Sequence, residues 1–140
     1  MESIEKNNLV IIRLSSNEDF NDMLIRACTK HKIKTDFVIS CIGQLKYSKL
    51  GYFKKKGDYC PQEFKKPLEI ISINGNIIFQ EEEYLLHLHA ILGDRDKKTY
   101  GGHFIDGIIS VTAEIVLLKS DVNIKRIFDK ETGLKSLILE

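Results

Sequence analysis

Three of the four histidines in this 140-residue chain lie within one short stretch of the sequence. His87 and His89 are separated by one residue in an apolar run, and His103 follows a Gly-Gly pair after the charged segment 94–98. Side chains two residues apart on a strand point to the same face, so His87 and His89 would present their imidazoles side by side. If segment 94–98 is a turn, His103 returns beside them. Three neutral imidazoles that converge in this way make an open metal site, with a position left for water or a ligand.

Zinc is the metal we expect at such a site, because imidazole suits it and the three cysteines show no C-x-x-C spacing. Glu114 is the candidate for a fourth ligand, or for an acceptor that hydrogen-bonds a ligating histidine and fixes its tautomer. A different interpretation stays open: the histidines could serve only to form hydrogen bonds inside a protein interface. The metal hypothesis predicts about one bound ion per chain.

Lysines and aromatic residues alternate between positions 52 and 66. Basic side chains interleaved with aromatic rings can bind phosphate backbones or single-stranded bases. A solvated loop is the simpler interpretation of the same pattern, and we favour it. The lysines concerned are Lys54, Lys55, Lys56, Lys65 and Lys66, and the aromatic residues are Tyr52, Phe53, Tyr59 and Phe64.

The elements that must position these groups can be read from the hydrophobic pattern. Apolar residues at helical spacing from Phe20 to Ala27 predict an amphipathic helix within residues 16–30. Ser16 and Asp19 resemble a capping box at its start. Short apolar runs predict strands at 9–14, 37–42, 45–53, 68–73, 76–80, 84–92, 108–119 and 122–128. Asn74-Gly75 predicts a two-residue hairpin turn between two of these strands.

This order of elements predicts an α+β fold with a largely antiparallel sheet and one main N-terminal helix, in a single domain over residues 1–140. The chain carries 21 basic and 20 acidic residues, which argues against binding nucleic acid by overall charge alone. The sequence contains no run of 18 apolar residues, so it predicts no membrane span, and the first residues do not resemble a signal peptide. An odd number of cysteines is typical of reduced thiols, so we expect a cytoplasmic protein.

Three motifs in order along the chain carry a resemblance to a known family. The first is VISCIGQLKYSKLGYF at 38–53, the second is LEIISINGNI at 68–77, and the third is the H-x-H, G-G-H and T-A-E series that ends at Glu114. Together they resemble the PPC domain, the plants and prokaryotes conserved domain. The resemblance spans roughly the whole chain and implies a compact mixed α/β domain that forms homotrimers.

The resemblance implies a binding module that contacts DNA or a protein partner. Plant relatives carry an AT-hook with an Arg-Gly-Arg-Pro core, and these 140 residues contain no such segment. The resemblance therefore does not imply that this chain has the full transcriptional role of the plant proteins. The alternative is a metal-dependent enzyme or sensor that binds a small molecule in the histidine pocket, and the sequence does not decide whether the protein is an enzyme. A structural assembly domain without chemistry is a third possibility.

Overall fold

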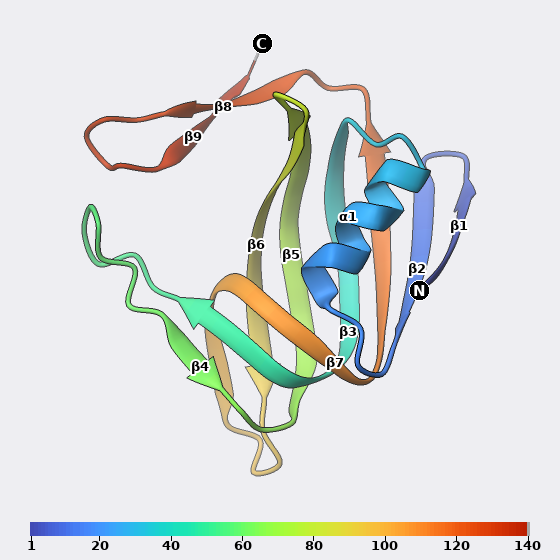
Figure 1. Ribbon diagram of the computed structural model, residues 1–140, viewed down its shortest axis with the longest axis vertical. Helices are drawn as coiled ribbons and strands as arrows, with labels where there is room; N and C mark the ends of the chain where they lie inside the picture. Colours follow the sequence, from blue (N-terminus) through green and yellow to red (C-terminus); the bar gives the residue numbers. More distant parts are fainter. Residues whose placement is uncertain (140) are drawn as a thin grey trace.

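The computed structural model describes residues 1–139, and strands dominate it (Figure 1). The elements in chain order are β1 (Glu2–Lys6), β2 (Leu9–Ser15), α1 (Phe20–Lys30), β3 (Thr35–Gly51), β4 (Gln62–Phe64), β5 (Leu68–Gln80), β6 (Glu83–Gly93), β7 (Thr99–Ser120), β8 (Ile124–Phe128) and β9 (Lys135–Leu139).

The first seven strands form one antiparallel sheet in the order β1-β2-β7-β6-β5-β3-β4. The long strand β7 also pairs with β3, and this extra pairing joins β3, β5, β6 and β7 into a closed ring. Such closure leaves few unpaired edges. β8 and β9 make a separate hairpin that lies beyond the upper ends of β5 and β6 in Figure 1.

The architecture is mainly β, so the α+β class that the sequence predicts is met only loosely. Within residues 1–139 there is a single α-helix of 11 residues, while strands supply the rest of the regular structure. The expectation of a largely antiparallel sheet is confirmed. The α+β expectation gave the helix too much weight, because α1 supplies only four buried residues and most of the other buried hydrophobic residues lie on strands. No helix in the described part of the chain is long and apolar enough to cross a membrane.

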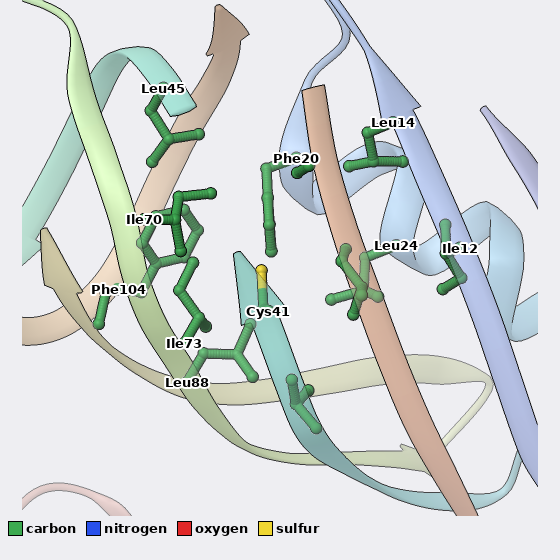
Figure 2. Packing of buried hydrophobic residues seen from close by; sticks show 14 of the residues in the cluster. Ile12, Leu14, Phe20, Leu24, Cys41, Leu45, Ile70, Ile73, Leu88 and Phe104 are labelled. Carbon is green, nitrogen blue, oxygen red and sulfur yellow. The ribbon is translucent and has the colours of Figure 1, made fainter. Parts of the chain in front are cut away.

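Helix α1 packs against β7 and β2 and buries its apolar stripe there. Its N-cap is Asp19, whose side chain accepts a hydrogen bond from the backbone N–H of Asp22 at 2.9 Å. The helix therefore starts later than the predicted Ser16 cap, and segment 16–18 forms the approach to it. The apolar side chains meet in one core (Figure 2), in which Phe20 and Phe104 stack edge to face with ring centroids 5.0 Å apart.

The hairpin predicted at Asn74-Gly75 is wrong. Strand β5 runs straight through this pair, and Gly75 is matched with Val38 on one side and Leu88 on the other. Gly75 has φ +150°, and a Cβ atom on it would lie 2.0 Å from the carbonyl oxygen of His87. The glycine serves close packing of two strands, while the turn itself falls after Gln80, where the two residues 81 and 82 have positive φ.

Candidate metal centre

The three histidines come from two neighbouring strands, as the sequence predicts. His87 and His89 lie on β6, and His103 lies on β7 directly opposite His89 in the register. The turn expected at 94–98 forms, since the backbone N–H of Lys97 donates to the carbonyl of Asp94 at 3.0 Å. His87 and His89 alternate with core residues such as Leu88, so their imidazoles point away from the core, on the outer face of the sheet.

The imidazoles face one another closely enough to share one ion. Ring centroids are 5.3 Å apart for His87 and His89, 5.5 Å for His87 and His103, and 5.5 Å for His89 and His103. One ring nitrogen from each histidine lies within 4.8 Å of the others. Zinc bonds to nitrogen of about 2.0–2.1 Å place tetrahedral donors about 3.4 Å apart. Modest side-chain rotations can therefore close the three donors around a zinc ion.

Burial keeps two of these imidazoles neutral, which is the form that binds metal. Desolvation lowers the pKa of His103 to about 4, and the neighbouring His87, His89 and Arg126 act in the same direction. Desolvation also lowers the pKa of His87, helped by the positive charge of Arg126. A metal therefore does not have to displace a proton from either residue at neutral pH.

His103 carries a further sign of a missing partner. Its Nδ1 atom is buried and has no hydrogen-bond partner among the described residues. Buried polar atoms are nearly always satisfied in folded proteins, so an isolated one calls for a ligand or water. A cation bound by the three histidines would satisfy such an atom, and the donor set of three imidazoles suits zinc.

Arg126 on β8 reaches the same cluster, and the sequence did not single it out. One terminal nitrogen of its guanidinium donates to Nδ1 of His87 at 2.9 Å and to Oδ1 of Asn76 at 2.8 Å. The other donates to the carbonyl of Lys135 at 3.0 Å. Segment 124–128 carries two adjacent cations, Lys125 and Arg126, and its sequence does not show which of them is buried. Only the fold shows that Arg126 faces inward and where that strand lies.

The β8–β9 hairpin is fastened beside the histidines through Gln80, at the end of β5. The side chain of Gln80 accepts a hydrogen bond from the backbone N–H of Arg126 at 2.9 Å and donates to its carbonyl at 3.1 Å. This pair of bonds extends the sheet pattern with a side-chain amide in place of a backbone peptide. The position of Arg126 is therefore fixed at its backbone as well as at its guanidinium.

A cavity of about 450 Å³ opens beside the cluster. His87, His103 and Arg126 line it, together with Tyr59 from the β3–β4 connection. The rings of Tyr59 and His103 meet edge to face with centroids 5.2 Å apart. This volume is enough for a small molecule next to the nitrogen donors.

Glu114 is not brought to the histidines. It lies on β7 eleven residues beyond His103, where its register partners are Arg13 on β2 and Ile42 on β3. The pKa of Arg13 is raised mainly by its hydrogen bond to Glu2, and the negative charge of Glu114 adds a smaller effect. The described residues that could hold a metal together are the three histidines alone, so the single chain gives no support to Glu114 as a ligand or hydrogen-bond acceptor.

The five candidate lysines flank β4, and several have nearby acidic partners. Lys65 lies 3.5 Å from Glu63, Lys54 lies 3.9 Å from Asp58, and Lys66 lies 3.4 Å from Asp94. The remaining two, Lys55 and Lys56, lie in the β3–β4 connection. The backbone of Lys55 pairs with that of Asp58, and the ammonium of Lys56 donates to the carbonyl of Lys130. Local pairing reduces the net positive charge that this surface offers to a phosphate backbone.

These features define a mainly β protein with a histidine cluster at the outer face of its sheet, and comparison with known proteins gives its family. The Plants and Prokaryotes Conserved (PCC) domain matches residues 1–121. The chain belongs to this family, which confirms the resemblance to the PPC domain. The matched residues include all three clustered histidines, while Arg126 and the β8–β9 hairpin lie after them.

Solved structures with the same fold include a metal-containing protein from Archaeoglobus fulgidus, 27% identical, with a TM-score of 0.84 over 96% of this chain and 95% of that one. A plant- and prokaryote-conserved protein from Pyrococcus horikoshii is 28% identical, with a TM-score of 0.84 over 96% and 92%. A Bacteroides thetaiotaomicron protein named as a putative DNA-binding protein has a TM-score of 0.91 over 99% and 96%, and its 24% identity shows the fold alone.

A curated relative adds a different context for the domain. The chain is 31% identical over 131 residues to the bifunctional protein GlmU of a Synechococcus species. The alignment covers 92% of this chain but only 20% of that protein. The chain thus corresponds to one fifth of a longer relative.

Proposed function

We propose that this chain is a homotrimeric metal-binding module of the PPC family, in which His87, His89 and His103 hold one divalent cation, zinc first. The observation that carries the proposal is the convergence of three ring nitrogens to within 4.8 Å of one another. The three imidazoles lie outside the apolar core, so packing of the core does not explain why they converge. Coordination of one metal ion by all three would account for their arrangement.

Two further observations favour a metal over a hydrogen-bonded interface. His103 leaves Nδ1 buried and unpartnered, and burial lowers the pKa values of His103 and His87. The similar Archaeoglobus fulgidus structure is named as metal-containing, which agrees with a metal at the equivalent fold. A bound zinc ion would supply Lewis acidity at its open position.

Exposed apolar side chains on the sheet support assembly into a homotrimer. Ile71 is 51% exposed and Ile91 is 48% exposed, and Ile91 shares the outer face of β6 with His89. Ile39 and Ile42 on β3 are similarly exposed. Covering such surfaces in an oligomer recovers hydrophobic free energy that a monomer would lose.

DNA is the partner that related proteins suggest, because structures of this fold are named as putative DNA-binding proteins. Lys54, Lys55, Lys56, Lys65 and Lys66 are the residues we propose for such contacts. The near-neutral charge and the paired lysines predict weak binding, which should fall as salt rises. Fluorescence anisotropy with single- and double-stranded DNA at two salt concentrations tests this. An absence of binding at low salt would contradict DNA as a partner.

A small-molecule enzyme or sensor is the second candidate function. The cavity of about 450 Å³ next to His87 and His103 favours it, since a DNA-binding surface has no need for one. A ligand there could reach the open position of the metal. The same cavity serves a sensor and an enzyme, and substrate turnover is the measurement that separates them.

Metal content of the native oligomer is the decisive experiment. Elemental analysis and native mass spectrometry of protein purified without chelators should give one zinc per chain and three chains per particle. Trace metal in carefully prepared protein would remove the metal site. A monomer with stoichiometric metal would support the metal site and contradict the proposed trimer.

A further inference from the structure

The cavity beside the histidines has an unusual charge. Two cationic residues, Arg126 and Lys135, line it with His87 and His103, and no aspartate or glutamate among residues 1–139 does so. The remaining walls are aromatic, aliphatic or amide side chains: Asn21, Tyr59, Tyr84, Leu85, Leu86, Phe104, Ile105 and Leu134. A divalent ion held by the histidines would add two further positive charges to a site to which residues 1–139 contribute no carboxylate.

Arg126 is the buried charge in this arrangement. This residue is only 9% exposed, and its Nε atom has no hydrogen-bond partner in the part of the chain that the structure describes. Desolvation lowers the pKa of Arg126, although a guanidinium keeps its proton throughout the physiological range. The guanidinium thus has a free donor while it lies next to the imidazole of His87.

The bond between Arg126 and His87 cannot persist when His87 binds a metal. A neutral imidazole has one nitrogen with a lone pair, and Nδ1 of His87 uses it to accept from the guanidinium at 2.9 Å. Coordination through Nδ1 needs this lone pair, and coordination through Nε2 leaves a proton on Nδ1 that faces the guanidinium. In both cases the terminal N–H of Arg126 must turn to another acceptor.

The positive charges of the metal and of Arg126 indicate that this acceptor is an anion. A guanidinium and a divalent ion a few ångströms apart in a partly buried cavity repel each other strongly unless an anion lies between them. A carboxylate suits this position, because the planar fork of arginine pairs with its two oxygens and a carboxylate oxygen is also a zinc ligand. The apolar walls from Leu85, Leu86 and Leu134 then select an anion with an apolar body.

We propose that the cavity binds a small, apolar monocarboxylate whose carboxylate lies between the metal and the guanidinium of Arg126. This inference rests on the proposed metal site and names the class of ligand for it. The guanidinium that would bind the carboxylate comes from the β8–β9 hairpin, which lies outside the residues that match the family. Gln80 holds the hairpin in place, so the guanidinium is positioned before the ligand arrives.

The test is a calorimetric titration of zinc-loaded protein with acetate, butyrate and hexanoate, in a buffer free of carboxylate and phosphate. Each methylene that enters the apolar part of the cavity should tighten binding about fourfold. Inorganic phosphate is titrated in parallel. It should bind more weakly than butyrate, because it has no apolar body.

Three variants isolate the arginine. Arg126→Gln should weaken butyrate binding at least tenfold, and Arg126→Lys should lie between that variant and the wild type because it keeps the charge but loses the fork. Lys130→Gln removes one positive charge from the exposed tip of the same hairpin, outside the residues that line the cavity, and should leave binding unchanged. Circular dichroism and zinc content are measured for each variant, so that a folding defect or metal loss is recognised.

Three outcomes overturn the proposal. The first is a full zinc content without any carboxylate binding, which leaves the metal site standing and removes only the ligand. The second is equal butyrate affinity in the wild type and in folded, zinc-loaded Arg126→Gln. The third is phosphate binding as tight as butyrate with no dependence on chain length, which assigns the site to any anion. Absence of zinc from the wild type contradicts the proposed metal site itself.

Discussion

His89 on β6 and His103 on β7 are direct register partners, with ring centroids 5.5 Å apart. This pairing depends on the turn between Asp94 and Lys98, which sets the register of the two strands. A slip by one residue would move His103 to the opposite face of the sheet. The histidine cluster is therefore a consequence of strand register as much as of residue type.

Removal of one histidine should abolish stoichiometric metal binding. We expect His103→Ala and His87→Ala to lose the zinc, since two imidazoles and water make a much weaker site than three. Elemental analysis measures the loss directly. Thermal melts with and without EDTA give a second readout: the chelator should lower the melting temperature of the wild type and leave His103→Ala unchanged.

The fourth histidine supplies the matched control for that experiment. His31 lies at the end of α1 and hydrogen-bonds Glu5 and Ser3, away from the cluster. His31→Ala should keep its zinc. Equal zinc in His31→Ala and His103→Ala would contradict the assignment of the site.

Asp36 on β3 should make the protein less stable as pH rises. Its side chain is fully buried, neither carboxyl oxygen has a hydrogen-bond partner among residues 1–139, and desolvation raises its pKa to about 7. The folded state then holds a proton that the unfolded state, with a carboxyl pKa near 3.9, releases. The free energy of unfolding therefore falls between about pH 4 and pH 7 and stays low above it.

Asp36→Asn should remove this pH dependence. At pH 8.5 the variant should be more stable than the wild type by about 2 to 4 kcal/mol, and at pH 4 the two should be similar. Urea denaturation at both pH values measures the difference. Asp96→Asn, in the exposed turn, should behave as the wild type at both pH values, and a wild-type stability that does not fall with pH would show that Asp36 ionises normally.

Gly75→Ala should destabilise the sheet beneath the histidines. The added Cβ would lie 2.0 Å from the carbonyl oxygen of His87, and φ +150° is rare for a residue with a side chain. We expect a loss of about 3 kcal/mol in the free energy of unfolding, together with weaker zinc binding because β6 must shift. Gly57→Ala is the comparison: its Cβ meets nothing within 4 Å, so it should cost less despite φ +77°. Equal losses in the two variants would show that contact with β6 does not matter.

A charge on the outer face of β6 should break the proposed trimer. Ile91→Lys places an ammonium on a surface that would be buried between subunits, and burying it unpaired is costly. Light scattering coupled to size exclusion should then report monomers. Val122→Lys, which changes an exposed valine in the β7–β8 connection, should remain trimeric. A trimeric Ile91→Lys would exclude this face from the interface.

Much of the histidine cluster could be predicted from local sequence. The H-x-H spacing fixes the shared face of His87 and His89, and the charged segment 94–98 indicates the turn that returns His103. These features depend on the alternation of side chains and on turn chemistry within about 20 residues. Helix α1 was likewise predicted from its apolar spacing, although its cap proved to be Asp19.

The features that failed are those that depend on distant strands. Asn74-Gly75 has the local signature of a hairpin, but β3 and β6 flank this glycine and need its missing Cβ within an uninterrupted strand. Glu114 has the right chemistry for a ligand, but it lies eleven residues beyond His103 on β7, so within a single chain it stays a prediction without structural support. Local patterns do not report which strands will lie side by side.

The sequence by itself determined the three metal-binding candidates and the turn that joins their strands, because both follow from short-range backbone geometry. Only the tertiary structure decided that β3 pairs with β7, that the sheet closes, and that Arg126 lies against His87 across 39 residues of chain. Those contacts arise from the burial of apolar strand faces and from hydrogen bonds such as those of Gln80, which act between segments far apart in sequence.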